Sequence, residues 1–532
     1  MEGSTVFDSE FERSLFELRR GKLQGIEKLG QAAYPNQFPA SHTIPAIRTK
    51  WDATTGEELE ATRVTVAVAG RIMAIRAQGK AGFAVLQQGG QRLQIYVRMD
   101  AVGEQGFALY KLLDLGDHIG VAGYLFRTRT GELTIHVERL TFLSKALLSM
   151  PEKFHGLADK ELRYRQRYVD LFSNLEAREV FVKRAAVLRA LRRFFDERSY
   201  LEVETPMMQP IAGGAAARPF KTHHNALDMD LFLRIAPELY LKRLVVGGLD
   251  RVYEINRNFR NEGLGWRWNP EFTMLEAYQA YTNYEGIMNL TQESITNAAI
   301  AVNGSAKSKW TRVEDGKEVV EELDWSNWQR LTMREAIIKF WPEKAGAKPE
   351  MSEFATSDGV KNLITRFNAA HAHMAYDPNA PAGKNIAALF EAAAEEHLTQ
   401  PTIIYEFPTA ISPLSKQKPD EPDWTERFEI YAGQMEIANG FSELNDPVDQ
   451  RRRFEEQLKE RERGDDEAHQ MDEDYIRALS YGMPPAGGVG IGMDRVCMLL
   501  TDQHTIRDVI LFPLLRPETK TTEDAEDAEK QK

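Results

Sequence analysis

Two periodicities divide the chain into an N-terminal and a C-terminal part. Residues 8–30 carry apolar side chains at helical spacing, among them Phe11, Leu15 and Phe16, and predict one amphipathic helix. The stretch AAYPNQFPASHTIP then interrupts the pattern with three prolines, which is typical of a linker. We therefore predict a helix and a linker over residues 1–55.

Between residues 63 and 143 the apolar positions alternate with polar ones instead. Five short segments of this kind are separated by glycine-containing turns, as in a series of antiparallel strands. Their number and spacing predict a small closed barrel of the OB type over residues 56–145. The alternative is an open meander that serves as a structural cap.

The second part follows a polar, proline-marked linker at residues 146–160. Leu191 and Phe195 recur at helical spacing, and the helix leads into a strand that ends before Pro206. Later segments such as RVYEINRNF and EFTMLEAYQ alternate like strands and are close in sequence. Antiparallel strands with helices between them indicate an α+β fold for residues 161–517, rather than a parallel βαβ array.

Two segments of this second part lack a clear pattern. Residues 302–325 are polar and aperiodic, so we predict an inserted surface loop there, within a larger insertion at about residues 302–400. That insertion also contains one predicted helix, near residues 379–398. Residues 518–532 are acidic and poor in apolar side chains, which predicts a disordered tail.

The composition of the chain mainly excludes classes of protein. The 532 residues are 42% hydrophobic and 28% charged, as in ordinary globular proteins. No apolar run is long enough to span a bilayer and the first residues do not resemble a signal peptide, so we expect a cytoplasmic protein without membrane contact. The lone Cys497 excludes an internal disulfide and a multi-cysteine zinc site. A net charge of −13 argues against binding nucleic acid through overall charge, but it allows a local basic surface.

The predicted hairpin at residues 255–279 is the first candidate for chemistry. Arg260 precedes the turn, Glu262 follows it closely, and Phe272 lies on the returning strand. A guanidinium binds phosphate or carboxylate through two parallel hydrogen bonds, and an aromatic face can stack on a purine. A surface ion pair between Arg260 and Glu262 beside a core phenylalanine explains the same residues, and on this hairpin alone it is the better explanation.

A glycine-rich stretch near the C-terminus strengthens the case for a nucleotide. Gly488, Gly490 and Gly492 alternate along a predicted strand that leads into a helix carrying Arg495. Alternating glycines allow close approach of a ligand to one strand face, and a helix start with a cation suits an anion. Tight packing of the strand on the helix is the alternative.

A pair of carboxylates suggests a metal. Glu429 and Glu436 lie on two neighbouring predicted strands, with Asn439 and Glu443 just beyond. Carboxylates near a triphosphate are the oxygen ligands that Mg²⁺ prefers. Solvated strand carboxylates are the commoner explanation for any single pair.

Taken together, these stretches resemble one enzyme family. FRNEG…NPEFTMLEAY resembles motif 2 of the class II aminoacyl-tRNA synthetases, GVGIGMDR resembles motif 3, and YLEVETPMM resembles motif 1, a dimer-interface element. APELYLKRL and NGFSELND resemble the lysyl-tRNA synthetase family within subclass IIb. The likeness runs from about residue 55 to 517 and is interrupted around residues 302–400.

The resemblance implies an enzyme that activates L-lysine with ATP and transfers it from lysyl-adenylate to the 3′ end of lysine tRNA. It also implies Mg²⁺ as cofactor and a homodimer. The site residues it implies are Arg260 and Arg495 for catalysis; Arg260, Glu262, Phe272, Glu429, Gly492 and Arg495 for ATP; Glu429 and Glu436 for the metal; Gly214, Glu238, Arg260, Glu276, Tyr278, Asn439, Phe441 and Glu443 for lysine; and Arg76, Phe83 and Gln94 for the anticodon.

Two alternatives remain at this stage. One is a lysine-adenylating enzyme that modifies a protein, and the other is a non-catalytic nucleic-acid-binding paralogue. At the predicted anticodon site, Phe83 as a barrel-core residue is the plainer explanation. The sequence also departs from the family at Trp268, where relatives usually carry histidine.

Overall fold

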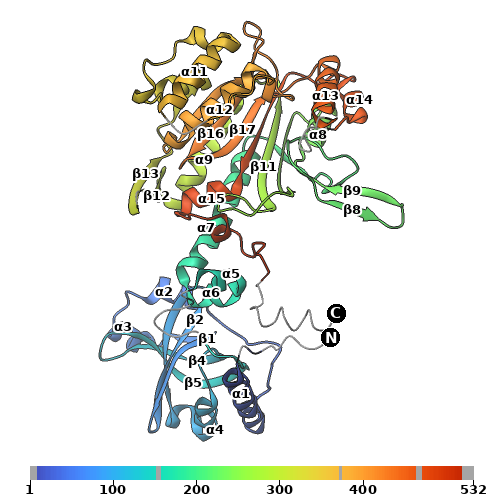
Figure 1. Ribbon diagram of the computed structural model, residues 1–532. Coiled ribbons are helices and arrows are strands. Elements are labelled where there is room, and N and C mark those ends of the chain that lie inside the picture. Colours follow the sequence, from blue (N-terminus) through green and yellow to red (C-terminus); the bar gives the residue numbers. More distant parts are fainter. Residues whose placement is uncertain are drawn as a thin grey trace, which may run out of the picture. The chain divides into compact units, whose positions relative to one another are not determined.

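A computed structural model describes the protein at residues 7, 9–150, 157, 159–314, 316–370, 374–462 and 470–517. The predicted tail, and residues 151–156 and 158 of the predicted linker, lie outside the described residues. The chain forms two compact units, Met1–Arg178 and Glu179–Lys532, with helix α7 (Leu175–Asp196) running across the boundary (Figure 1).

The first unit contains a closed five-stranded barrel with the strand order β1-β2-β3-β5-β4. Its strands are β1 (Thr65–Gln78), β2 (Ala81–Gln88), β3 (Gln91–Arg98), β4 (His118–Arg127) and β5 (Leu133–Ser144). In β3, Leu93, Ile95 and Val97 are fully buried, whereas Gln94 and Tyr96 are only partly buried, as strand alternation requires. The predicted OB-type barrel is therefore confirmed and the open meander is not.

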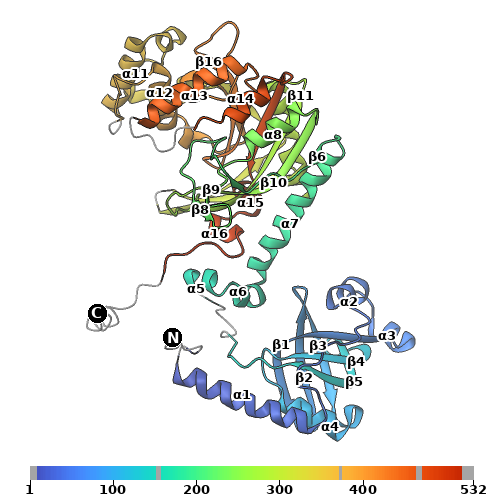
Figure 2. The same cartoon turned by 90° about the vertical axis from the view of Figure 1, so that its right-hand side faces the viewer.

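Short helices surround the barrel. They are α1 (Glu10–Lys28), α2 (Ile44–Trp51), α3 (Gly56–Thr62), α4 (Met99–Leu112), α5 (Lys160–Arg165) and α6 (Arg167–Ser173). Helices α1 and α4 lie side by side at one end of the barrel, as Figure 2 also shows. The predicted N-terminal helix is confirmed, but the segment read as a linker contains α2 because Thr43 caps it and Pro45 suits a first turn.

The second unit is built on an eight-stranded sheet with the order β14-β15-β16-β17-β18-β11-β10-β6. Its strands are β6 (Leu201–Glu202), β10 (Arg251–Phe259), β11 (Glu271–Ala280), β14 (Gln329–Thr332), β15 (Thr402–Pro408), β16 (Trp424–Ala432), β17 (Met435–Ser442) and β18 (Ala486–Gly492). All neighbours are antiparallel except the two outermost pairs, β14 with β15 and β10 with β6. The predicted α+β fold is confirmed.

The remaining elements flank this sheet. The helices are α8 (Glu238–Val246), α9 (Tyr284–Asn303), α10 (Met333–Lys339), α11 (Ser357–Ala370), α12 (Ala382–Ala393), α13 (Pro447–Glu462), α14 (Glu473–Leu479), α15 (Met493–Thr501) and α16 (Ile506–Val509), with 3-10 turns at Glu343–Ala345, Met351–Ala355, Glu395–His397 and Thr409–Ile411. A separate small sheet contains β7 (Met208–Gln209), β8 (Lys221–His224) and β9 (Met229–Leu233). Within the described part of the chain, no helix has the length and apolarity needed to cross a membrane.

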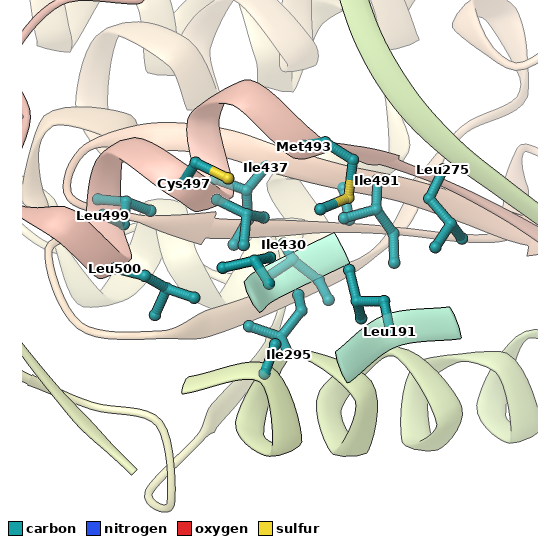
Figure 3. Close-up of a cluster of buried hydrophobic side chains, with 14 of the residues drawn as sticks. Leu191, Leu275, Ile295, Ile430, Ile437, Ile491, Met493, Cys497, Leu499 and Leu500 are labelled. Carbon is teal, nitrogen blue, oxygen red and sulfur yellow. The ribbon is translucent and has the colours of Figure 1, made fainter. Parts of the chain in front are cut away.

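One face of the large sheet forms the main hydrophobic core. Leu275, Ile430 and Ile491 from three strands meet Leu191 of α7 and Ile295 of α9 (Figure 3). All five side chains are almost fully buried. Because strand side chains alternate between faces, burying this face leaves the opposite face of the same strands available for a site.

The prediction of an inserted surface loop at residues 302–325 was wrong, because most of the segment is regular strand. The segment forms a hairpin of β12 (Lys307–Glu314) and β13 (Lys317–Asp324). Trp310 and Leu323 anchor it in the core, while Val313 and Val320 are exposed on the outer part of the hairpin. Charged and apolar residues share the exposed face, so the usual alternation is hidden in the sequence.

Candidate active site and nucleic-acid interface

A cavity of about 560 Å³ lies over strands β11, β16, β17 and β18 of the second unit. It brings together residues from sequence-distant motifs. The predicted site residues that line it are Gly214, Glu238, Arg260, Glu262, Phe272, Glu276, Tyr278, Glu429, Glu436, Asn439, Phe441, Gly492 and Arg495. Glu443, the remaining residue predicted for this unit, is not in the lining.

Strand alternation explains how β11 serves both the core and the cavity. Phe272, Glu276 and Tyr278 line the cavity, whereas Leu275 between them belongs to the core. Side chains two positions apart share a strand face. The strand therefore presents an aromatic ring, a carboxylate and a phenol to the cavity in sequence order.

The glycines of β18 form the cavity wall beside Glu443. A Cβ atom at Gly488 would lie 2.2 Å from Glu443 Oε1 and 2.5 Å from the Tyr278 ring. Any larger residue would collide with both groups. Glu443 Oε1 and the Tyr278 ring therefore occupy the space that a side chain at position 488 would fill.

A β-bulge in β17 brings more polar residues to the same side. Glu429 pairs with Asn439 and Tyr431 pairs with Glu436, so β17 contains one more residue than β16 between these pairs. The extra residue reverses the alternation along β17. As a result Glu436 and Asn439 both line the cavity, although they are an odd number of positions apart.

One end of the cavity is suited to anions. Arg260 is half-buried, and its Cζ lies 5.1 Å from the centroid of the Phe272 ring. Its Nε is a buried donor without a hydrogen-bond partner among the described residues. Burial lowers the pKa of Arg260. The nearby carboxylates of Glu262 and Glu436 raise it, but they do not offset the effect of burial. An incoming anion would relieve the cost of keeping this partly buried cation.

Arg495 lies at the first turn of α15, next to the same end. Its Nη1 donates to the Glu436 carbonyl oxygen at 2.6 Å and lies 3.6 Å from Glu436 Oε2. The preceding residue, Asp494, accepts a hydrogen bond from the Thr273 backbone at 2.8 Å and pairs with Arg184 at 2.7 Å. These contacts connect α7, β11 and α15, and fix the position of Arg495.

The two carboxylates predicted to bind a metal, those of Glu429 and Glu436, are close enough to repel each other. Glu429 accepts from Arg427 Nη2 at 2.5 Å and from the Tyr431 hydroxyl at 2.6 Å. Burial raises the pKa of Glu429 to about 7; Arg427 opposes this, and Glu436 adds to it. A cation near both carboxylates would relieve their repulsion, so this donor set fits Mg²⁺ that is completed by phosphate oxygens. Among the described residues, no group of three or more His, Cys, Asp or Glu side chains forms a metal site from protein alone.

The opposite end of the cavity is acidic and aromatic. Burial raises the pKa of Glu276 to about 8, and Glu238 and Glu254 add to the effect. The Tyr278 hydroxyl donates to Glu276 Oε2 at 3.3 Å. A buried carboxylate that lacks a cation suits an ammonium group, and the aromatic rings of Tyr278 and Phe441 suit its methylene chain.

Sequence reasoning missed a buried cation at this acidic end. Lys242 Nζ lies 2.5 Å from Glu238 Oε1 and 2.5 Å from Glu443 Oε2. Burial lowers the pKa of Lys242, but these two carboxylates raise it above its ordinary value. The only signal in the sequence was the spacing of four between Glu238 and Lys242, which places them on one helix face.

The loop between β10 and β11 carries the departure from the family pattern. Trp268 lines the cavity and is 49% exposed. Its backbone carbonyl accepts from Gly265, and that of Trp266 accepts from Ile506 of α16 at 2.8 Å. The Arg267 Cζ lies 4.2 Å from the Trp266 ring centroid. The loop thus presents an indole ring to the cavity where a histidine was expected.

The first unit brings together the residues predicted for the anticodon. Phe83 is not part of the barrel core; it stacks on Tyr96 with ring centroids 4.5 Å apart, and the Arg76 Cζ lies 5.2 Å from its centroid. Gln94 donates to Thr134 Oγ1 at 3.0 Å. The plainer explanation of Phe83 as a core residue is therefore wrong.

These residues belong to a longer surface feature that the sequence did not reveal. The strand registers align Phe83 with Tyr96, Tyr96 with His136, and His136 with Tyr124. We call these four residues the aromatic row. The His136 and Tyr124 rings stack with centroids 4.8 Å apart, and Arg63 lies over Tyr124. Aromatic rings flanked by guanidinium groups are typical of surfaces that bind single-stranded nucleic acid.

Comparison with known families agrees with both units. A family model described as "tRNA synthetases class II (D, K and N)" matches residues 159–516. A second, described as "OB-fold nucleic acid binding domain", matches residues 66–143.

Individual relatives are similar over nearly the whole chain. A lysine–tRNA ligase of Moorella thermoacetica is 50% identical, with 96% of this chain and 99% of the relative covered. A lysine–tRNA ligase of Syntrophomonas wolfei is 49% identical, with 96% and 99% covered. The heat-inducible lysine–tRNA ligase of Escherichia coli K12 is 49% identical, with 94% and 96% covered.

Proposed function

Because the chain belongs to the lysine–tRNA ligases of the class II tRNA synthetases, we propose that the cavity of the second unit binds lysine and ATP and that the barrel binds the anticodon of lysine tRNA. The enzyme is an ATP-dependent aminoacyl-tRNA ligase that joins lysine to tRNA. The single observation that carries the placement is the polarity of the cavity, which has arginine at one end and buried carboxylates at the other.

Lysine lies with its side chain in the acidic end. Glu276 and Glu443 receive the ε-ammonium group, and Tyr278, Asn439 and Phe441 line the methylene chain. The α-amino group lies near Glu238 and Gly214. The positive backbone φ of Gly214, +88°, and the 3.0 Å gap from its ideal Cβ to Glu238 Cβ support a close approach there.

ATP lies towards the arginine end. Phe272 stacks on adenine, and Glu262 lies on the same side of the base. Arg260 holds the α-phosphate together with the lysine carboxylate, while Arg495 and Gly492 lie near the γ-phosphate. Glu429 and Glu436 would hold Mg²⁺, which supplies charge neutralisation for the triphosphate.

The chemistry needs no side-chain nucleophile. A lysine carboxylate oxygen attacks the α-phosphorus in line, the bond to the bridging oxygen breaks, and pyrophosphate leaves. The 3′-terminal hydroxyl of tRNA then attacks the carbonyl carbon of lysyl-adenylate, and AMP leaves. The protein contributes orientation and charge stabilisation through Arg260 and Arg495. Cys497 is not a candidate nucleophile, because burial raises its pKa to about 12.

The assembly we propose is a twofold-symmetric homodimer in the cytoplasm. Leu201, Met207 and Met208 lie in or beside the short strands of the motif 1 region and are 47–56% exposed. An apolar strand segment of this kind needs cover from a partner, and a twofold interface uses the same patch on both copies.

Pyrophosphate exchange tests the proposal. We expect lysine to stimulate ATP–pyrophosphate exchange, and aspartate to leave it at background, because Glu276 and Glu443 repel an acidic side chain. Exchange that depends on aspartate and not on lysine would overturn the assignment of the acidic end.

A further inference from the structure

A buried cation, Lys242, lies next to the acidic end of the cavity. The Lys242 side chain has no exposed surface, and its Nζ bridges Glu238 and Glu443 at 2.5 Å each. The centroid of the Phe441 ring lies 5.2 Å from Nζ. A buried ammonium group is strongly unfavourable without paired charges, so the chain retains one here against a desolvation cost.

We propose that Lys242 is a specificity-determining positioning residue: a built-in counter-ion that matches the charge of the pocket to lysine and fixes the carboxylates that receive it. The inference rests on the lysine site proposed above and assigns a role to a residue that does not itself react.

Charge balance is the first argument. When ionised, Glu238, Glu276 and Glu443 contribute three negative charges, and Lys242 compensates one of them. Lysine brings two ammonium groups to the two remaining charges, and Arg260 matches its carboxylate. An amino acid with a neutral side chain leaves one buried carboxylate unpaired, which penalises the wrong substrate.

Geometry is the second argument. Lys242 Nζ forms an ion pair with Oε2 of Glu443, and neither oxygen of this buried carboxylate has a hydrogen-bond partner among the described residues, so Oε1 has neither an ion pair nor a hydrogen bond there. Oε1 lies at the Gly488 wall, where an added Cβ would be 2.2 Å away. Lys242 therefore leaves one carboxylate oxygen, held at a fixed position, for a substrate ammonium.

The charged groups around Lys242 make its proposed role measurable as a pH dependence of lysine binding. The other charged or titratable groups acting on the cluster are Tyr278 of β11, Glu254 of β10, Arg260 and Tyr475 of α14. Glu254 is itself paired with Arg234 at 2.7 Å. Burial raises the pKa of Glu443, Lys242 lowers it, and Glu238 adds to the effect of burial. Without Lys242 this carboxylate holds its proton more tightly, so a substrate ammonium must displace a proton there more often than in the native enzyme.

Lys242→Met is the first test, because methionine keeps much of the side-chain length without the charge. We expect KM for lysine in pyrophosphate exchange to rise at least tenfold while KM for ATP stays within about twofold. The pH at which kcat/KM for lysine reaches its plateau should move upward. A lysine KM and pH profile equal to those of the native enzyme would overturn the proposal.

A double variant separates charge matching from a merely structural ion pair. Glu443→Gln alone leaves the pocket one negative charge short, whereas Lys242→Met with Glu443→Gln restores the native surplus of two. We expect the double variant to have a lysine KM at least threefold lower than Glu443→Gln alone. A structural ion pair predicts no such recovery, so a KM equal to or above that of Glu443→Gln contradicts the proposal. The double variant also remains a test of the proposal if Lys242→Met alone does not fold.

Arg243→Met is the matched control. Arg243 neighbours Lys242 on α8 and pairs with Asp472 at 2.9 Å, outside the cavity. It should lower the melting temperature without changing the lysine KM. If the native enzyme shows no lysine-dependent exchange at all, the proposed function fails. If the native enzyme shows such exchange but the Lys242 variants keep the native lysine KM, as Arg243→Met does, this inference alone fails.

Discussion

At the scale of single residues, Arg260 is the group on which the proposed chemistry depends most. It lies beside Phe272, and its Nε is buried without a hydrogen-bond partner among the described residues, so in the proposed complex it supplies a cation where charge develops on the α-phosphate. Arg260→Ala should lower lysine-dependent pyrophosphate exchange by about 10²–10³-fold, the usual cost of losing one preorganised charge-stabilising group.

Arg257→Ala is its control. Arg257 lies on β10, three residues before Arg260; its side chain is 42% exposed, and it pairs with Glu271 outside the cavity. Its loss should leave the exchange rate within about twofold. Near-native exchange by Arg260→Ala would remove Arg260 from the mechanism.

A second prediction for a single residue concerns Glu276 and the pH dependence of lysine binding. Burial raises its pKa to about 8, so it holds a proton in the empty pocket at neutral pH, whereas a bound ammonium favours the ionised form. Apparent lysine affinity should therefore rise as pH increases from about 6.5 to about 8 and then level off, with proton release on binding. Titration calorimetry in buffers of different ionisation enthalpy measures this release. Affinity that falls over the same range would contradict the placement of Glu276.

The same shift has a defined sign for stability. Because the folded pKa lies above the ordinary value of 4.5, the native state binds more protons than the unfolded state between these values. The contribution of Glu276 to stability is therefore fully present below about pH 4.5 and is lost as pH rises through about 8.

At the scale of elements, the aromatic row shows how a barrel makes a binding surface. Five neighbouring strands bring one outward residue each into register, which gives a row of rings between Arg76 and Arg63. Phe83→Ala removes one stacking ring, worth about 1–3 kcal/mol per base. It should weaken tRNA charging by about ten- to a hundredfold and leave pyrophosphate exchange unchanged.

Leu86→Ala on the same strand is the contrasting variant. Leu86 is fully buried in the barrel, so its truncation should cost about 2–5 kcal/mol and lower the melting temperature strongly. If Phe83→Ala instead lowers the melting temperature as much as Leu86→Ala does, or leaves charging untouched, the aromatic row is not the anticodon surface.

At the scale of the whole molecule, the sequence predicted what depends on local pattern. Alternation indicated β11 and β18, and motif resemblance then supplied Arg260, Glu276 and Arg495, all of which line one cavity. What it missed depends on register or on distant partners. The bulge in β17, the Lys242 bridge and the aromatic row each require knowing which residues lie opposite one another. The β12–β13 hairpin was missed because its exposed face mixes valine with charge.

The proposed homodimer is the prediction that concerns assembly. One chain has a mass of 60.5 kDa, so sedimentation at micromolar concentration should give a species of twice that mass. Met208→Asp, which puts a charge on an exposed apolar position of the motif 1 region, should shift the equilibrium towards the single chain. A native enzyme that sediments only as the single chain would contradict the proposal.

In the proposed function, one chain activates lysine in the cavity of its second unit and transfers it to tRNA held by its barrel. Aminoacylation of total tRNA with radiolabelled lysine and ATP tests it most directly. We expect ATP-dependent label at the 3′ end of lysine-accepting tRNA only, released by mild base as expected for an ester. Stable label on protein with none on tRNA, or no incorporation despite lysine-dependent pyrophosphate exchange, would contradict it.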